Sequence, residues 1–206
     1  YSITKIGVGK STIFTYTYPL WAALLAPLLL QERIKLGVLA AVLASLGGLY
    51  LIIVPPEGLG QTSWFDLVAI IGGLFAGWAI LSIKKLHATD TSSAIIFSQS
   101  FFGFFIVAAP SHAHGYALAW PAWGILIAVG LVAAAAQLQM THAYRFIGAT
   151  EGSLLSMLTP VMSVGLGLLV FHETVTSRSL IGCIIVLLGC TYAAIPQKIP
   201  EGGLGN

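Results

Sequence analysis

The chain carries very little charge. Of its 206 residues, 8% are Asp, Glu, Lys or Arg, whereas 57% are hydrophobic, and the mean hydropathy is +0.93. A soluble domain carries roughly a quarter charged residues, so this chain has too few to cover a surface that faces water. Its net charge of +2 is too small to indicate binding to nucleic acid. We therefore expect an integral membrane protein whose main partner is the lipid bilayer.

Cysteine is nearly absent, and the two cysteines that occur do not form a metal-binding pattern. Cys183 and Cys190 lie seven residues apart in the last apolar run. No histidine or carboxylate joins them at the spacing of metal ligands, and buried free cysteines usually act as small packing residues. The sequence predicts neither a metal site nor a cofactor.

Motifs for membrane-embedded catalysis are also missing. The apolar runs contain no HExxH sequence, no paired aspartates and no Ser/His set, so we do not expect an enzyme. No carboxylate lies at the middle of a run, so there is no obvious proton-relay residue. The run at 179–197 has no lysine, which a retinal-binding protein needs in its last helix.

The charged residues divide the chain into apolar runs of membrane-spanning length. About 20 apolar residues cross a bilayer as a helix, and a helix satisfies its own backbone groups without water. Five runs have the length of one helix, and the run from Asp90 to Arg145 has the length of two. The sequence predicts an all-α polytopic membrane protein with seven transmembrane helices, at about residues 12–30, 36–54, 64–83, 92–110, 120–141, 149–171 and 177–195.

Two of these runs share a pattern of proline and glutamate. Pro19 and Glu32 bound one segment, PLWAALLAPLLLQE, and Pro160 and Glu173 bound the other, PVMSVGLGLLVFHE. The proline and the glutamate are thirteen positions apart in both segments, and the second segment lies 141 positions after the first. The equal spacing indicates an internal repeat.

The repeat extends to the neighbouring helices. At the same offset of 141, Gly7 pairs with Gly148 and Gly48 with Gly189. Five predicted spans separate a helix from its partner, and an odd number inverts the second copy relative to the membrane. Inverted repeats are typical of alternating-access carriers, whose substrate site lies between the two halves.

The proline, glutamate and glycine pattern resembles the EamA-type transporters of the drug/metabolite transporter superfamily. That resemblance implies ten helices in two inverted repeats of five, of which the seven spans correspond to helices 4–10, so we expect the chain to be truncated at its N-terminus. Residues 1–54 would be the last two helices of the first repeat, and residues 64–195 the complete second repeat. A loop at 55–63 joins them, and a polar tail follows at 196–206.

The resemblance further implies transport of small organic solutes, such as metabolites, amino acids or drugs, by uptake or efflux. We expect the pathway to be lined by polar or aromatic side chains inside the spans: Tyr16, Trp78, Gln99, Gln137, Thr141 and Ser156. Five of them have an alternative role. Tyr16 could belong to an interfacial aromatic belt, Trp78 could pack in the interior, and Gln99 could form a hydrogen bond between helices. Gln137 and Thr141 could lie at the surface where their helix leaves the bilayer.

Pro19, Glu32, Pro160 and Glu173 are expected to be structural or gating residues. A seven-helix receptor and a helical membrane partner without transport remain alternatives, although a receptor does not explain the repeat. A homodimer is left open.

The distribution of cations predicts the orientation in the plasma membrane of a bacterial cell. One side holds Arg33, Lys35, Lys84, Lys85, Arg145 and Lys198, and the other holds Lys5, Lys10 and Arg178. By the positive-inside rule the richer side is cytoplasmic, so the C-terminus is predicted to lie in the cytoplasm.

This orientation predicts that residue 58, in the loop after the second span, faces outward. A cysteine in place of Gly58 should react with an impermeant maleimide added outside intact cells. Labelling only from the cytoplasmic side would contradict the predicted orientation.

Overall fold

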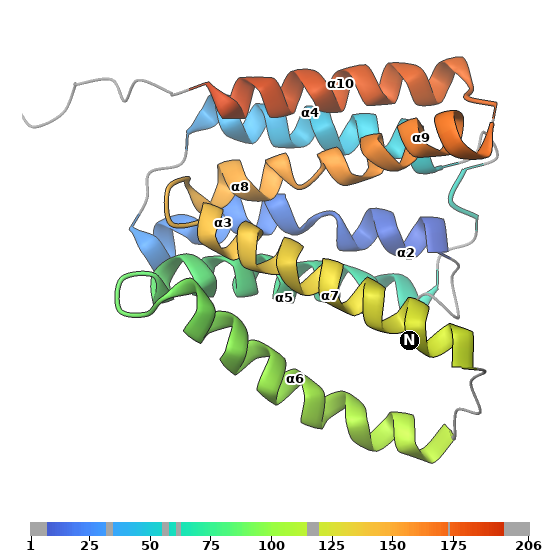
Figure 1. The fold of residues 1–206 in the computed structure, drawn as a ribbon. Coiled ribbons are helices and arrows are strands. Elements are labelled where there is room, and N and C mark those ends of the chain that lie inside the picture. Colours follow the sequence, from blue (N-terminus) through green and yellow to red (C-terminus); the bar gives the residue numbers. More distant parts are fainter. Residues whose placement is uncertain are drawn as a thin grey trace, which may run out of the picture. The chain divides into compact units, whose positions relative to one another are not determined.

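The computed structural model describes residues 8–31, 35–54, 58–60, 63–114, 120–172 and 174–195, and within them all regular structure is helical (Figure 1). The helices are α2 (Val8–Thr15), α3 (Tyr18–Leu30), α4 (Leu36–Ile53), α5 (Trp64–Leu86), α6 (Ser92–His114), α7 (Trp120–Ala143), α8 (Ala149–Leu155), α9 (Leu158–Phe171) and α10 (Ser177–Ala194). The prediction of an all-α protein is confirmed for these residues.

Six helical segments of the described chain are long and apolar enough to cross a membrane. They are Lys10–Leu30, α4, α5, α7, Ala149–Phe171 and α10. The predicted span at 92–110 corresponds to α6, whose apolar part, Ser92–Ala108, is shorter. Six of the seven predicted spans are therefore confirmed by length and composition, and the seventh stays a prediction.

Two of the predicted spans are broken helices. The span at 12–30 consists of α2 and α3, separated by a turn at Tyr16 and Thr17, and the span at 149–171 consists of α8 and α9, separated by a turn at Ser156 and Met157. Each break lies just before the repeat's proline. Proline has no backbone N–H and its ring clashes with the carbonyl four residues earlier, so it does not continue a helix from the preceding turn.

The structure reproduces the repeat at the same offset of 141. Helices α4 and α10 each have 18 residues, and their ends correspond residue for residue. Helices α3 and α9 both end on a residue in the left-handed conformation, Gln31 at φ 56° and His172 at φ 52°. These equivalent residues are the two non-glycine residues with positive φ in the described chain. The correspondence between the helices therefore includes backbone conformation.

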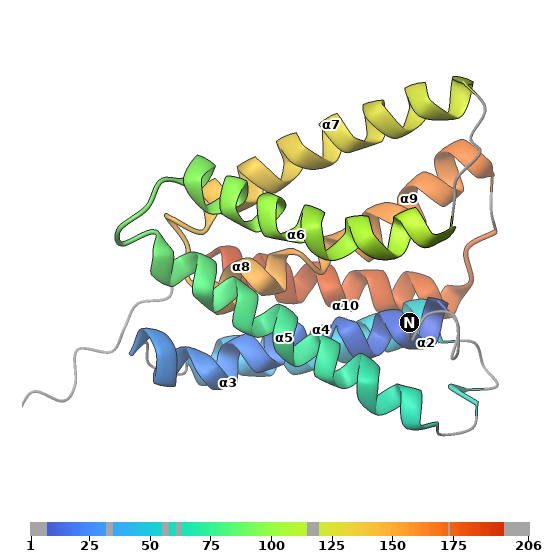
Figure 2. The ribbon, with the colours of Figure 1, turned by 90° about the horizontal axis from the view of Figure 1, so that it is seen from below.

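Helices α4 and α10 pack against each other in antiparallel orientation (Figures 1 and 2). A Cβ added to Gly48 would lie 2.7 Å from the carbonyl oxygen of Gly182 and 3.0 Å from Val186, and one added to Gly189 would meet Ser45 and the carbonyl of Ala41. Gly189, Ala41 and Ser45 are the repeat equivalents of Gly48, Gly182 and Val186, so the two sets of contacts are equivalent. The two helices therefore cross about a local two-fold axis, as inverted copies do.

The main apolar core lies along this helix pair. Its fully buried members include Val42, Leu49, Leu154, Met157 and Val186. Tyr16 and Leu158, at the two helix breaks, pack against it. The crossing of α4 and α10 thus supports both breaks.

The chain divides into two compact units. Unit 1 comprises Tyr1–Leu81 and Ala149–Asn206, and unit 2 comprises Ser82–Gly148. Within unit 2, α6 and α7 form a helical hairpin (Figure 2). Large apolar side chains on both helices are exposed, as expected where lipid replaces water.

The close contact at Gly48 and Gly182 generates a stability prediction. Gly48→Ala and Gly182→Ala each place a methyl group against the opposing backbone, which side-chain motion does not relieve. We expect each to lower the free energy of unfolding by about 1–3 kcal/mol, measured as a loss of thermal stability in detergent.

Gly47 provides the matched control. It lies next to Gly48 on α4, but a Cβ there meets nothing within 4 Å. Gly47→Ala should be neutral or slightly stabilising because alanine favours helix over glycine. Equal effects at positions 47 and 48 would show that the α4–α10 contact is not as close as described.

Candidate functional site at the crossing of two broken helices

The break between α2 and α3 is closed by short-range backbone hydrogen bonds. The N–H of Thr17 donates to the carbonyl of Phe14 at 3.3 Å, and the carbonyl of Thr17 accepts from the N–H groups of Leu20 at 2.9 Å and Trp21 at 3.3 Å. Two of these bonds span three residues instead of four, which tightens the chain into a 3₁₀-like turn. The turn restores partners that a break inside a membrane would otherwise remove.

Side chains complete the hydrogen bonding at this break. The Thr17 hydroxyl donates to the carbonyl of Phe14 at 2.6 Å and accepts from the indole N–H of Trp21 at 3.1 Å. Two residues earlier, the Thr15 hydroxyl donates to the carbonyl of Ser11 at 2.9 Å. The polar start of this span, TIFTYT, thus supplies hydroxyl groups where the helix is interrupted.

The break between α8 and α9 is built in the same way. The N–H of Met157 donates to the carbonyl of Leu154 at 3.0 Å, and the N–H of Thr159 donates to the carbonyl of Ser156 at 3.1 Å. The Ser156 hydroxyl donates to the carbonyl of Gly152 at 3.2 Å. Met157 and Thr17 precede their helices with nearly equal dihedral angles, φ −68°, ψ −7° and φ −70°, ψ −8°.

Cys190 contributes to this second break. Its thiol, buried on α10, donates to the carbonyl of Leu154 at 3.3 Å. Cys190 therefore both packs in the core, as the sequence predicts, and supplies a weak donor to the break. Cys183 is buried as well and, like Cys190, is a free thiol.

The two breaks meet inside unit 1. The Tyr16 side chain makes a hydrogen bond with the side chain of Thr159, and its ring lies 5.7 Å from that of Tyr18. Thr159 is the repeat equivalent of Tyr18. Because α3 also packs against α8, the two discontinuous helices cross close to their breaks.

Helix α5 approaches the first break through two glycines. A Cβ on Gly73 would lie 2.6 Å from the Thr17 hydroxyl and 2.8 Å from the carbonyl of Phe14, and one on Gly77 would lie 2.9 Å from Trp21. Glycine at these two positions, four residues apart, lets the α5 backbone come close to the break.

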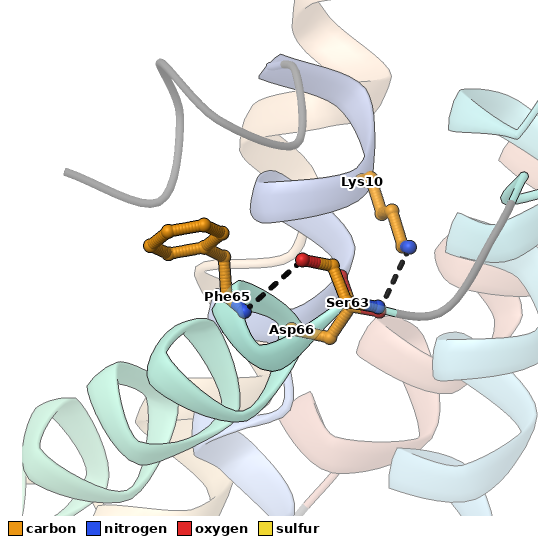
Figure 3. A network of polar contacts seen from close by, with 4 residues as sticks. All are labelled: Lys10, Ser63, Phe65 and Asp66. Carbon is orange, nitrogen blue, oxygen red and sulfur yellow. Dashed lines mark hydrogen bonds and ion pairs between the residues drawn. The ribbon is translucent and has the colours of Figure 1, made fainter.

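Two ion pairs lie in unit 1 away from the breaks. Lys10 Nζ lies 2.8 Å from Asp66 Oδ2, and both side chains are about nine-tenths buried. Asp66 Oδ2 also accepts from the N–H of Ser63 at 2.8 Å and so caps the start of α5. Figure 3 shows these two residues together with Lys10. The second pair joins Lys35 Nζ to Glu151 Oε1 at 2.8 Å, and here the lysine is 41% exposed.

The residues predicted to line the pathway are not gathered at one place in unit 1. Tyr16 and Ser156 both lie at the breaks, half-buried. Trp78, on the part of α5 in unit 1, is 51% exposed. Pro19 and Pro160 are buried, and Glu32 and Glu173 lie outside the described residues.

The other three predicted pathway residues lie in unit 2. Gln99 is exposed on α6, and Gln137 is half-buried on α7. Thr141 is fully buried, and its carbonyl is hydrogen-bonded to His87 Nε2 at 2.7 Å. The structure therefore places Thr141 in the interior of unit 2.

Several polar residues that make contacts in unit 1 were not among the predicted site residues: Lys10, Thr17, Lys35, Asp66, Glu151 and Thr159. The four charged residues were used to bound apolar runs and, for Lys10 and Lys35, to predict the orientation. Lys10 and Glu151 are equivalent at the offset of 141, which was the one available signal that they share a role.

Comparison with protein families agrees with this architecture. The model of the EamA-like transporter family matches residues 1–54 and 63–195. The chain belongs to this family. The predicted membership of the drug/metabolite transporter superfamily is therefore confirmed, and the protein is an integral membrane protein of a transporter family.

Individual relatives are also transporters by name. The pseudopaline exporter CntI of Pseudomonas aeruginosa is 27% identical over 96% of this chain and 70% of its own length. An uncharacterized transporter of Helicobacter pylori is 30% identical over 49% of this chain and 34% of its own length. Family and relatives point to a transporter and not to an enzyme.

A protein of known crystal structure has the same fold. It superimposes with a TM-score of 0.78 over 94% of this chain and 69% of its own length, at 16% sequence identity. The arrangement of helices is therefore shared with a solved structure.

The Thr17 hydroxyl both donates and accepts a hydrogen bond at the first break, which leads to a prediction. Thr17→Val keeps the shape of the side chain but removes the donor to Phe14 and the acceptor for Trp21. We expect the free energy of unfolding to fall by about 1–3 kcal/mol, together with a change in tryptophan fluorescence, both measured in detergent.

Thr191 is the matched control. Its hydroxyl donates to the carbonyl of Leu187 at 2.8 Å on the exposed side of the unbroken helix α10. Thr191→Val should have little effect, since that carbonyl keeps its helical partner. A Thr17 variant as stable as the Thr191 variant would show that the hydroxyl does not support the break.

Proposed function

We propose that the protein is a carrier that moves small organic solutes across the membrane by alternating access between two inverted repeats. In this proposal the seven spans correspond to helices 4–10 of a ten-helix carrier. Residues 1–54 form the end of the first repeat, and residues 64–195 form the whole second repeat. The repeat-equivalent broken helices, α2–α3 and α8–α9, carry the proposal because discontinuous helices at a repeat interface are a recurrent feature of carrier sites.

The packing of unit 1 supports this assignment. Helices α4 and α10 are equivalent at the offset of 141, are antiparallel, and exchange contacts about a local two-fold axis. In a carrier with such an axis, the two repeats exchange conformations, which opens the pathway to each side of the membrane in turn. A receptor or a passive membrane partner has no need of that relation.

The most suitable substrate contacts are Tyr16 and Ser156, because both lie at the breaks and are half-buried. Each offers a hydroxyl group and neither is charged. Trp78, Gln99, Gln137 and Thr141 remain pathway candidates on their chemistry alone. The substrate is then a small solute recognised by hydroxyl groups and aromatic rings, with little contribution from fixed charge in the spans.

Export is the favoured direction. The relative that matches 96% of this chain is named an exporter. With the C-terminus in the cytoplasm, as the cation distribution predicts, the solute is loaded from the cytoplasmic side and released outside. Pro19, Glu32, Pro160 and Glu173 act as structural or gating residues at the breaks and helix ends.

Transport by reconstituted full-length protein tests the proposal. Proteoliposomes should show saturable flux of at least one compound among pseudopaline and the common amino acids. Pro160→Ala removes the residue that interrupts α8–α9, and Glu173→Ala removes the charge that closes the repeat segment. Both variants should reduce flux at least about tenfold, by removing interactions made in only one state of the carrier.

Pro27→Ala is the control for the prolines, because Pro27 lies inside the continuous helix α3 and has no proline at its repeat equivalent. It should keep most of the flux. Wild-type flux in Pro160→Ala and Glu173→Ala at equal expression would refute the role assigned to this segment.

A further inference from the structure

The two ion pairs of unit 1 occupy related places in the repeat. Lys10 is the third residue of α2, and Glu151 is the third residue of α8. They are repeat equivalents and carry opposite charges. Each is paired with a residue at the beginning of another helix, Lys10 with Asp66 on α5 and Glu151 with Lys35 before α4. Each broken span begins with a short helix, α2 or α8. Each ion pair holds the first turn of that short helix against another helix.

The ion pairs lie at opposite ends of unit 1. Lys10 begins the apolar span that ends at Leu30, and Lys35 follows that span after a short connection. A helical span of this length separates its ends by about 30 Å. The α2–α5 ion pair thus closes one end of the unit and the α4–α8 ion pair the other (Figure 1).

The helix breaks give these ends the freedom to move. Each leading half, α2 or α8, is joined to its following half by a two-residue turn, and motion at such a turn changes few backbone hydrogen bonds. In hinge motions, a few residues at the ends of secondary-structure elements absorb the change in backbone conformation. An ion pair at the far end of the short helix holds the hinge in one position.

We propose that the α2–α5 and α4–α8 ion pairs are latches that open in turn during the carrier cycle, each releasing one end of unit 1. This inference rests on the proposed carrier function. In the present structure both ion pairs are formed. The latch residues are positioning residues and are not substrate contacts.

The two latches are unequal. Both side chains of the α2–α5 pair are about nine-tenths buried, whereas in the α4–α8 pair Glu151 is 14% exposed and Lys35 is 41% exposed. Separating the first pair leaves two charges out of water, whereas water can take over the contacts of the exposed Lys35. The α4–α8 end therefore opens more often. In the predicted orientation this is the cytoplasmic end, where an exporter takes up its solute.

Cysteine accessibility tests this proposal, with one probe near each latch. Ser11 and Ser153 are fully buried neighbours of Lys10 and Glu151, and Ser→Cys changes little in volume. Each probe is placed in full-length protein carrying Cys183→Ala and Cys190→Ser, which keeps a donor to Leu154. An impermeant maleimide is then applied to right-side-out and to inside-out vesicles.

The expected result is reciprocal. Asp66→Asn keeps an oxygen to cap Ser63 but removes the charge that binds Lys10, so Ser11→Cys should label at least about threefold faster. Ser153→Cys should then label no faster than before. Glu151→Gln should produce the opposite pattern, and exchanging the charges in Lys35→Glu with Glu151→Lys should return Ser153→Cys to slow labelling. Without these changes, Ser153→Cys should label faster than Ser11→Cys.

Asp90→Asn is the control, because Asp90 is an exposed carboxylate in unit 2 that contacts Thr89. It should change neither rate. Equal acceleration of both probes by Asp66→Asn would indicate general loosening and overturn the latch proposal, as would acceleration of neither. Solute flux is measured on the same vesicles: flux without reciprocal labelling rejects the latches alone, and reciprocal labelling without flux rejects the carrier function alone.

Discussion

A lipid bilayer offers no water to the backbone, so every interruption of a membrane helix needs partners from the protein itself. This constraint explains the organisation of unit 1. Two helices are broken before a proline, and both breaks are closed by backbone bonds that span three residues and by hydroxyl side chains. The thiol of Cys190 contributes a further donor. Thr17 and Ser156, two polar residues of these spans, lie where the helices are interrupted.

The need to support the broken helices also explains why glycine occupies several helix contacts in unit 1. Gly48, Gly182 and Gly189 let α4 and α10 cross closely enough for the core to support both breaks, and Gly73 and Gly77 let α5 reach the first break. Side chains at these positions would push the supporting helices away and expose backbone groups that the bilayer leaves unpaired. The small residues therefore serve the broken helices as much as they serve helix packing.

Much of this architecture was predictable from the sequence. Apolar runs give the spans, because the bilayer sets their length, and the spacing of Pro19, Pro160 and Gly48 reveals the repeat, whose helix ends match in the structure. The split of each proline-containing span into two helices was not predicted in detail, because a proline indicates a kink but not how its neighbours pair. Tyr16 and Ser156 were selected for their chemistry and lie at the breaks. Gln99 was selected in the same way but is exposed on α6. The ion pairs were missed because opposite charges distant in sequence give no local pattern.

The central claim is that the crossing of the two broken helices is the point to which both sides of the membrane gain access in turn. Its most direct test is to label Tyr16→Cys and Ser156→Cys from each side of the membrane in full-length protein whose native cysteines, Cys183 and Cys190 included, have been replaced. The account predicts that both positions react from the cytoplasmic side and also from the outside. Reaction of either position from one side alone, or of neither position from any side, would contradict it.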